Sequence, residues 1–125
     1  MKKLTPVLNV ETIEPVLPFW VDRLGFEKTA EVPHDGALGF VILKHGDVEI
    51  MYQTQASIEA DLGSAARVPL GGTSLFIEVA DLDDVERRLD GVQHVIPRRT
   101  TFYGADEIVV RDPAGNLVIF AHFGG

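Results

Sequence analysis

The stretch Asp112-Pro113-Ala114-Gly115-Asn116 lies between two runs of apolar and β-branched residues and decides the fold. Its proline presets the backbone angle φ for a tight turn, and its glycine can adopt a positive φ. The aspartate and the asparagine can both hydrogen-bond to the nearby backbone. We expect strands over residues 107–111 and 117–123 on either side. The stretch therefore predicts a β-hairpin close to the end of the chain.

Length and composition favour one compact domain over residues 1–125, with 46% hydrophobic and 24% charged residues. The net charge of −8 argues against a nucleic-acid partner. No apolar run approaches the roughly 20 residues that a membrane-spanning helix needs. The chain has no cysteine, which excludes disulfides, thiol catalysis and zinc–thiolate sites. We expect a cytoplasmic protein without a membrane partner, because cysteine-free chains are compatible with that compartment.

The two halves of the chain follow a weak internal repeat. Val10 and Val79 lie 69 positions apart, and the same offset pairs Gly46 with Gly115. Each half reads as a strand, a helix and three further strands. In the first half we expect strands over 4–10, 26–32, 38–44 and 48–53 and a helix over 11–24, which Pro18 should kink or delay. In the second half we expect strands over 73–79, 92–101 with a break near Pro97, 107–111 and 117–123, and a short helix over 82–89.

Three motifs occur in a fixed order along the chain: Pro18-Phe19-Trp20-Val21-Asp22-Arg23-Leu24-Gly25-Phe26, then Gly46-Asp47-Val48-Glu49-Ile50-Met51, then the closing hairpin. In this order they resemble the vicinal-oxygen-chelate superfamily, which includes glyoxalases, bleomycin resistance proteins and extradiol dioxygenases. The resemblance implies an α+β fold of two βαβββ modules that form a curved eight-stranded sheet with an internal cleft. The modules would span residues 1–53 and 71–125, joined by a linker over 54–70.

Members of this superfamily that use a metal carry ligands on the first and last strands of each half. The resemblance places three of these positions at Thr5, Ser74 and Ile119. The repeat offset places the fourth at Ile50, whereas a slip of one residue places it at Glu49. Only one of these positions carries a good metal donor, and none of the four histidines has ligand spacing. We therefore expect no metal, no cofactor and no catalytic residues.

The slipped register is the one we favour for the strand over 48–53. Side chains alternate along a strand, so the slip turns Glu49, Met51 and Gln53 toward the cleft. The unslipped register would bury the Glu49 carboxylate against the helix, at a cost of several kcal/mol. In the slipped register, Val48, Ile50 and Tyr52 pack on the helix side.

A metal-free cleft with apolar walls and a few polar groups is the usual form of a small-molecule site. Our candidate ligand-binding residues are Asn9, Phe40, Glu49, Met51, Phe76, Glu78, Phe102 and Tyr103. Tyr52 is a further candidate for the walls. For each aromatic residue we favour core packing over a place in the cleft wall, and a solvated sheet end is the alternative for Glu78. We expect Trp20 in the core and Arg111 as a brace for the closing turn.

The resemblance is strongest to bleomycin resistance proteins, which sequester a cationic aromatic antibiotic in clefts between the two chains of a dimer. It implies a metal-independent small-molecule-binding protein and a homodimer. The single tryptophan of the chain is a departure from a dense stacking surface. Two other classes stay open: a metal-dependent lyase, isomerase or dioxygenase, and a regulatory or immunity-like domain without a ligand.

Overall fold

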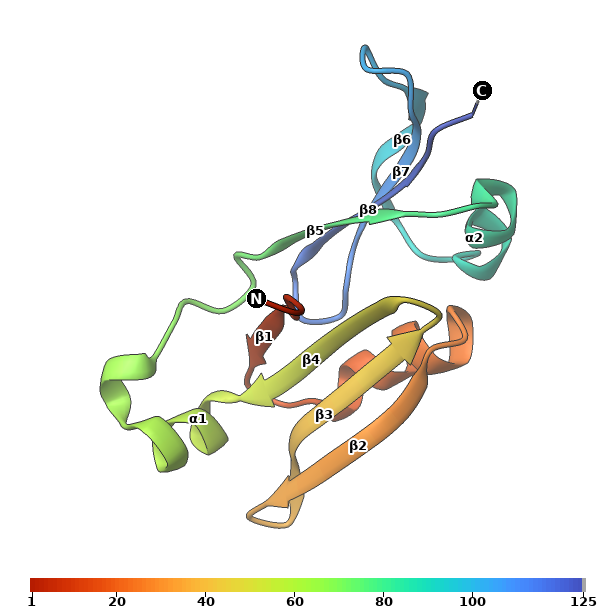
Figure 1. Ribbon diagram of the computed structural model, residues 1–125. Coiled ribbons are helices and arrows are strands. Elements are labelled where there is room, and N and C mark those ends of the chain that lie inside the picture. Colours follow the sequence, from red (N-terminus) through yellow and green to blue (C-terminus); the bar gives the residue numbers. More distant parts are fainter. Residues whose placement is uncertain (125) are drawn as a thin grey trace. The chain divides into compact units, whose positions relative to one another are not determined.

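The computed structural model describes residues 1–124 and divides the chain into two compact units, Met1–Gly71 (unit 1) and Gly72–Gly125 (unit 2). Each unit holds a four-stranded mixed sheet, in the order β1-β4-β3-β2 in unit 1 and β5-β8-β7-β6 in unit 2 (Figure 1). The predicted α+β class is therefore confirmed, with the eight strands divided four and four between two hydrogen-bonded sheets. The predicted grouping of all residues into one domain stays a prediction.

The strands and helices follow the expected order. Unit 1 contains β1 (Val7–Val10), β2 (Glu27–His34), β3 (Ala37–His45), β4 (Val48–Thr54) and α1 (Gln55–Leu62). It also contains a 3₁₀ turn over Glu14–Val16, a π-helical segment over Pro18–Arg23 and a 3₁₀ turn over Ser64–Ala66. Unit 2 contains β5 (Ser74–Glu78), α2 (Leu82–Arg88), β6 (His94–Thr100), β7 (Asp106–Arg111) and β8 (Leu117–His122).

The predicted helix over 11–24 is wrong as a single element. The structure has two short helical segments there, and each carries a proline within its first two positions. Proline has no backbone N–H to donate within a helix, so Pro18 begins a new segment and does not continue the preceding one. Within the linker over 54–70, α1 forms a complete helix. The Thr54 hydroxyl caps α1 by accepting from the Ser57 N–H at 3.1 Å.

The slipped register of β4 is confirmed by the strand pairing. Val7 of β1 lies opposite Met51 of β4, and Phe76 of β5 lies opposite Ile119 of β8. Val7 and Phe76, on the first strands, lie 69 positions apart, whereas their partners on the last strands, Met51 and Ile119, lie 68 apart. The last strand of unit 1 is therefore shifted by one residue relative to the repeat. Ile50 is buried on the helix-covered face, as the alternation predicts.

Aromatic side chains form the centre of the unit 1 core. Trp20 and Tyr52 are both fully buried, and the Trp20 indole Nε1 donates to the Tyr52 hydroxyl at 2.8 Å. Phe19 and Phe26 meet the Trp20 ring edge-to-face, with ring centroids 5.0 and 4.9 Å away. Trp20 is thus confirmed as a core residue. Tyr52 also lies in the core, as the alternation along β4 predicts, so it does not form a wall of the cleft.

The closing turn of unit 2, Asp112–Asn116, is stabilised by hydrogen bonds from its own side chains. The Asp112 carboxylate accepts from the backbone N–H of Ala114 at 3.0 Å and of Asn116 at 2.8 Å. The Asn116 side chain in turn accepts from the Thr73 N–H at 3.2 Å, which ties the turn to the start of β5. Gly115 has a φ of 90°, which favours glycine. Arg111 donates to the Gly115 carbonyl at 2.9 Å, which confirms its bracing role.

Across residues 1–124, no helix is both long and apolar enough to cross a bilayer.

Candidate functional site

Four of the predicted site residues lie on one face of the unit 1 sheet. We call this surface the open face; it lies opposite the face that packs on Trp20. Asn9 and Phe40 both lie opposite Gln53 of β4, so the three side chains share one rung across the sheet. Met51 and Glu49 follow on the next two rungs. Phe40 and Met51 are half-buried, so Phe40 is neither packed fully into the core nor fully exposed.

Glu49 on the open face is already paired with a cation. The Lys3 ammonium donates to the Glu49 carboxylate at 2.7 Å, and the Thr5 hydroxyl donates to the same oxygen at 3.4 Å. The hydrogen bond from Lys3 holds the pKa of the Glu49 carboxyl below its ordinary value, while partial burial opposes that effect. Because Lys3 balances its charge, Glu49 attracts a cationic ligand less than the sequence suggests.

The residues at the family's metal positions do not fit a divalent ion. Thr5 and Glu49 are brought together, but the cation beside them is the ammonium of Lys3. Ile119 has no donor atom, and its partner across the strand pair is Phe76. Among residues 1–124, no three side chains of His, Cys, Asp or Glu gather closely enough to hold a metal. The donor set therefore gives no basis for metal chemistry.

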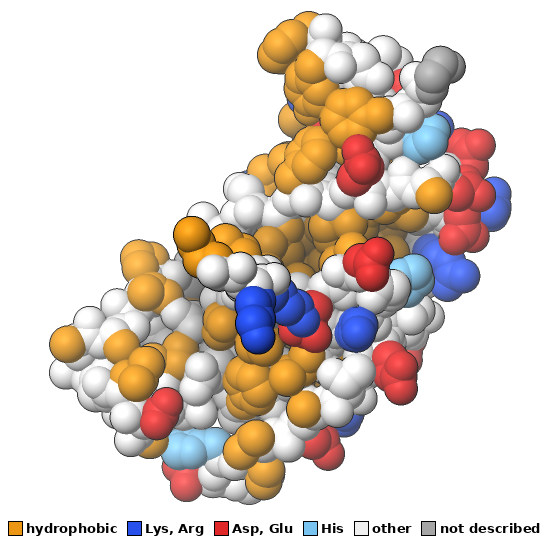
Figure 2. Space-filling view, viewed as in Figure 1, with side chains coloured by type: hydrophobic (Ala, Val, Ile, Leu, Met, Phe, Trp, Pro, Cys, Tyr) orange, Lys and Arg blue, Asp and Glu red, His pale blue; other side chains and the backbone are white. Residues whose placement is uncertain are grey.

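The other predicted aromatic residues form an exposed cluster in unit 2. We call it the aromatic face: Phe76 of β5, Phe102 and Tyr103 of the β6–β7 loop, and Phe123 just after β8. The Phe123 ring centroid lies 6.3 Å from that of Phe76 and 6.2 Å from that of Tyr103. Phe102 meets Tyr103 edge-to-face at 5.0 Å. In Figure 2, hydrophobic side chains gather where Figure 1 shows the β6–β7 loop.

All four aromatic side chains of this face are exposed, by 51% at Phe76, 101% at Phe102, 43% at Tyr103 and 45% at Phe123. Core packing is therefore wrong for Phe76, Phe102 and Tyr103. An isolated exposed aromatic residue needs no explanation, but a contiguous group of exposed apolar side chains is typical of an interaction surface. The three phenylalanine side chains have no hydrogen-bonding group, and the Tyr103 hydroxyl donates to Glu107.

Glu78 adds a negative charge to the edge of the aromatic face. It lies two residues after Phe76 on β5, and with Phe123 and His122 it lines an open pocket of about 420 Å³. The His122 ring nitrogen Nδ1 lies 3.0 Å from the Val79 carbonyl oxygen. A carbonyl only accepts, so Nδ1 carries the hydrogen, and in the neutral ring Nε2 is an acceptor. The pocket thus offers acceptors to a ligand that carries hydrogen-bond donors.

A buried carboxylate lies on the same side of the unit 2 sheet. Glu107 of β7 is opposite Ala121, which is opposite Glu78, so these three residues share one rung. Glu107 is only 2% exposed. Its two oxygens accept from the Arg99 guanidinium at 3.1 Å and from the Tyr103 hydroxyl. The pairing compensates for the loss of water around the charge.

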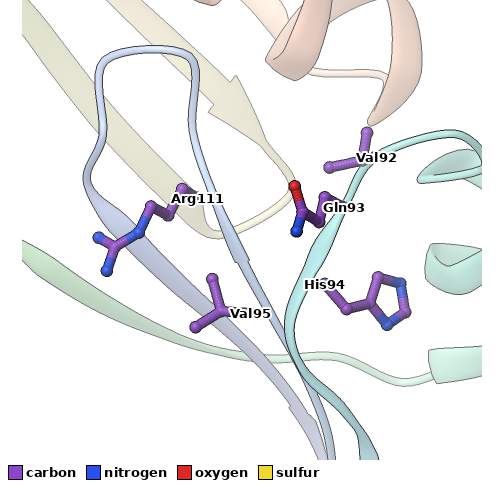
Figure 3. A pocket seen from close by; sticks show the side chains of 5 residues that line it. All are labelled: Val92, Gln93, His94, Val95 and Arg111. Carbon is purple, nitrogen blue, oxygen red and sulfur yellow. The ribbon is translucent and has the colours of Figure 1, made fainter.

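A second open pocket of unit 2, about 400 Å³ in volume, is lined by Val92, Gln93, His94, Val95 and Arg111 (Figure 3). His94 and Arg111 extend to opposite sides of it. The Arg111 guanidinium is also engaged with the Gly115 carbonyl of the closing turn. This pocket therefore lacks the converging polar groups of a ligand site.

The predicted site residues thus fall into two groups of four, one on the open face of unit 1 and one on the aromatic face of unit 2. Sequence reasoning missed Lys3, Arg99, Glu107 and Phe123. Glu107 had a usable signal, because it is an acidic residue directly before the apolar run Ile108-Val109-Val110. Lys3 and Arg99 had none, since their roles depend on partners 46 and 8 residues away.

The chain has the architecture of two repeated βαβββ units with one uncovered sheet face in each. Residues 4–120 match the model of the glyoxalase/bleomycin resistance protein/dioxygenase superfamily. The chain belongs to this superfamily. A search of curated proteins finds no match.

Solved structures with the same fold include both binding proteins and an enzyme. The bleomycin-binding protein of Streptomyces verticillus, complexed with copper(II)-bleomycin, is 28% identical, with a TM-score of 0.68 over 100% of this chain and 98% of that one. Lactoylglutathione lyase of Agrobacterium tumefaciens is 21% identical, with a TM-score of 0.77 over 98% and 94%. The bleomycin resistance determinant of transposon Tn5 is 20% identical, with a TM-score of 0.71 over 98% of both chains.

Proposed function

We propose that this protein is a metal-independent small-molecule-binding protein of the bleomycin resistance type. Its ligand would be a flat aromatic cation that stacks on the aromatic face of unit 2. The observation that carries the proposal is the group of exposed rings of Phe76, Tyr103 and Phe123, with Glu78 at their edge. Aromatic faces attract cations by their quadrupole, and a nearby carboxylate adds direct charge attraction.

The donor set at the metal positions supports a binding role over catalysis, since Ile119 cannot ligate and Lys3 pairs with Glu49. The Streptomyces verticillus protein, which is complexed with copper(II)-bleomycin, supports the ligand class. Antibiotic sequestration is the sharper form of the proposal. We also propose a homodimer, because Val7 on the open face and Phe76 on the aromatic face expose apolar area.

Isothermal titration calorimetry with copper(II)-bleomycin and with proflavine, a flat tricyclic cation, tests the proposal. We expect binding of at least one probe at micromolar concentration. Phe76→Ala should weaken it about tenfold or more, because stacking on one aromatic ring contributes about 1–3 kcal/mol. Glu78→Gln should weaken it by a smaller factor. Leu62→Ala and Asp47→Asn are matched controls, since they remove an exposed apolar side chain and an exposed charge in unit 1.

Failure of both probes to bind, or equal losses in the Leu62→Ala control, would contradict the proposed site. Metal analysis of the dialysed protein tests metal independence separately. Stoichiometric zinc, nickel, manganese or iron would favour the alternative, a metal-dependent glyoxalase-like lyase or isomerase or a dioxygenase. Light scattering at micromolar concentration tests the homodimer.

A further inference from the structure

The most unusual group in unit 2 is the buried carboxylate of Glu107. A buried charge is costly unless it is fully paired, and here each oxygen has one donor. Arg99 comes from the adjacent strand β6, where it lies directly opposite Glu107. Tyr103 comes from the loop that joins the two strands. Glu107 therefore connects strands β6 and β7 of the sheet to the Tyr103 ring of the aromatic face.

The loop that carries Tyr103 is closed by its own backbone. The Thr101 N–H donates to the Ala105 carbonyl at 2.7 Å, and the Thr101 hydroxyl accepts from the Ala105 N–H at 3.0 Å. Gly104 completes the turn with a φ of 86° and donates to the Thr101 carbonyl at 3.1 Å. Thr101 and Ala105 are buried, so the base of the loop is fixed. The Tyr103 ring lies at the exposed tip of the loop, and its hydroxyl ties it to Glu107 of β7.

We propose that Glu107 is a positioning residue for the ligand site, and this rests on the proposed function above. Its carboxylate holds the Tyr103 hydroxyl and so fixes the ring beside Phe123 before a ligand arrives. A side chain that is already ordered loses less conformational entropy on binding, and the affinity rises accordingly. Arg99 balances the charge of Glu107, so the pair acts through geometry and not by attracting a cation.

If Glu107 acts by positioning Tyr103, breaking their hydrogen bond should lower the affinity for charged and neutral ligands alike. Proflavine, a cation, and lumiflavin, a neutral flat ring system of similar size, serve as the two probes. Tyr103→Phe keeps the ring and removes its anchor. We expect it to weaken both probes by a few-fold, up to about tenfold, which is the range expected for the cost of ordering one side chain on binding. Glu78→Gln, as the contrast, removes a charge from the site and should weaken proflavine several-fold more than lumiflavin.

Glu107→Gln should weaken both probes to a similar degree, and Tyr103→Phe combined with Glu107→Gln should lose no more than either single variant. Additive losses would overturn the proposal, because they would mean that the two residues act separately. A loss confined to proflavine would also overturn it and assign Glu107 to charge attraction.

Hydrogen exchange of the backbone amides over residues 102–105 keeps the proposal testable if Glu107→Gln does not fold. Tyr103→Phe should raise their exchange in the ligand-free protein at least several-fold, while the amides of β7 stay protected. Unchanged exchange in that variant would overturn the positioning role even if the probes bind. If neither probe binds the unmodified protein but exchange rises as expected, the proposed function fails and the ordering role of Glu107 stands.

Discussion

Unit 1 covers its aromatic side chains, whereas unit 2 exposes most of its own, although both units have the same strand order and nearly the same register. In unit 1, Phe19, Trp20, Phe26 and Tyr52 are buried, and Phe40 is half-buried. In unit 2, Phe120 is buried, while Phe76, Phe102, Tyr103 and Phe123 are exposed. The same arrangement of strands thus buries its aromatic side chains in the core of unit 1 and leaves most of them exposed to solvent in unit 2.

The largest effect should come from the aromatic residues themselves. Trp20→Ala should lower the free energy of unfolding by about 3–5 kcal/mol, because it leaves a large cavity in a packed core. Phe76→Ala should cost less than about 1 kcal/mol, since its ring is 51% exposed. Urea unfolding followed by circular dichroism measures both. Similar losses would mean that the aromatic face is a second core and not a binding surface.

A smaller contrast is expected between the turns that precede the last strand of each unit. Asp112→Ala should cost about 2–3 kcal/mol, because it leaves buried N–H groups of the closing turn without an acceptor. Asp47→Ala, in the exposed turn between β3 and β4, should change stability by less than about 0.5 kcal/mol. Both are measured by thermal unfolding with matched urea titrations. An equal cost at Asp47 would show that the two turns have the same internal bonding.

The hydrogen bond between Trp20 and Tyr52 should contribute less. Tyr52→Phe should cost about 1–2 kcal/mol, because the buried indole N–H loses its acceptor. In a Trp20→Phe background the same change should cost less than in the natural chain, since the indole donor is already gone. A double-mutant cycle in urea measures this coupling. Additive costs would show that the two side chains stabilise unit 1 independently.

The smallest effect concerns the ion pair of Glu49 and Lys3 on the open face. The pKa of Glu49 is lowered by the Lys3 hydrogen bond, so the unfolded chain binds its proton more readily than the folded one. The stability that this carboxylate contributes is present above its ordinary pKa and is lost as the pH falls through the lowered value. The difference in melting temperature between the natural chain and Glu49→Gln should therefore shrink in acid. A difference that grows on acidification would reverse the sign of the linkage.

Most of the fold could be predicted because its signals are local. Turn chemistry at Asp112–Asn116 and alternation along β4 depend on neighbours in sequence, and both gave the correct hairpin and register. A single helix over 11–24 was wrong: the expected kink at Pro18 is a full interruption between two short segments. Proline removes the donor that a continuous helix needs, and the chain restarts at each one.

The candidate site could be predicted in part. Phe76, Glu78, Phe102 and Tyr103 were selected as residue types that suit a cationic ring, and the structure brings Phe76 and Tyr103 to either side of Phe123. The charge at Glu49 was overestimated, because Lys3 lies at the start of the chain and pairs with it only after folding. Burial could be predicted for Tyr52, where strand alternation indicates the side, but not for Tyr103, which lies in a loop without such a pattern.

The sequence by itself determined the order of elements, the closing turn, the superfamily and the scarcity of metal donors, because these depend on residue identity and short-range backbone chemistry. Tertiary structure alone decided which aromatic residues are buried, which carboxylates have a cation, and that Glu107 ties Tyr103 to the sheet. Those properties depend on which residue the long-range strand pairing places opposite each side chain. A residue of the same type therefore stabilises or destabilises the folded chain according to the partner it meets there.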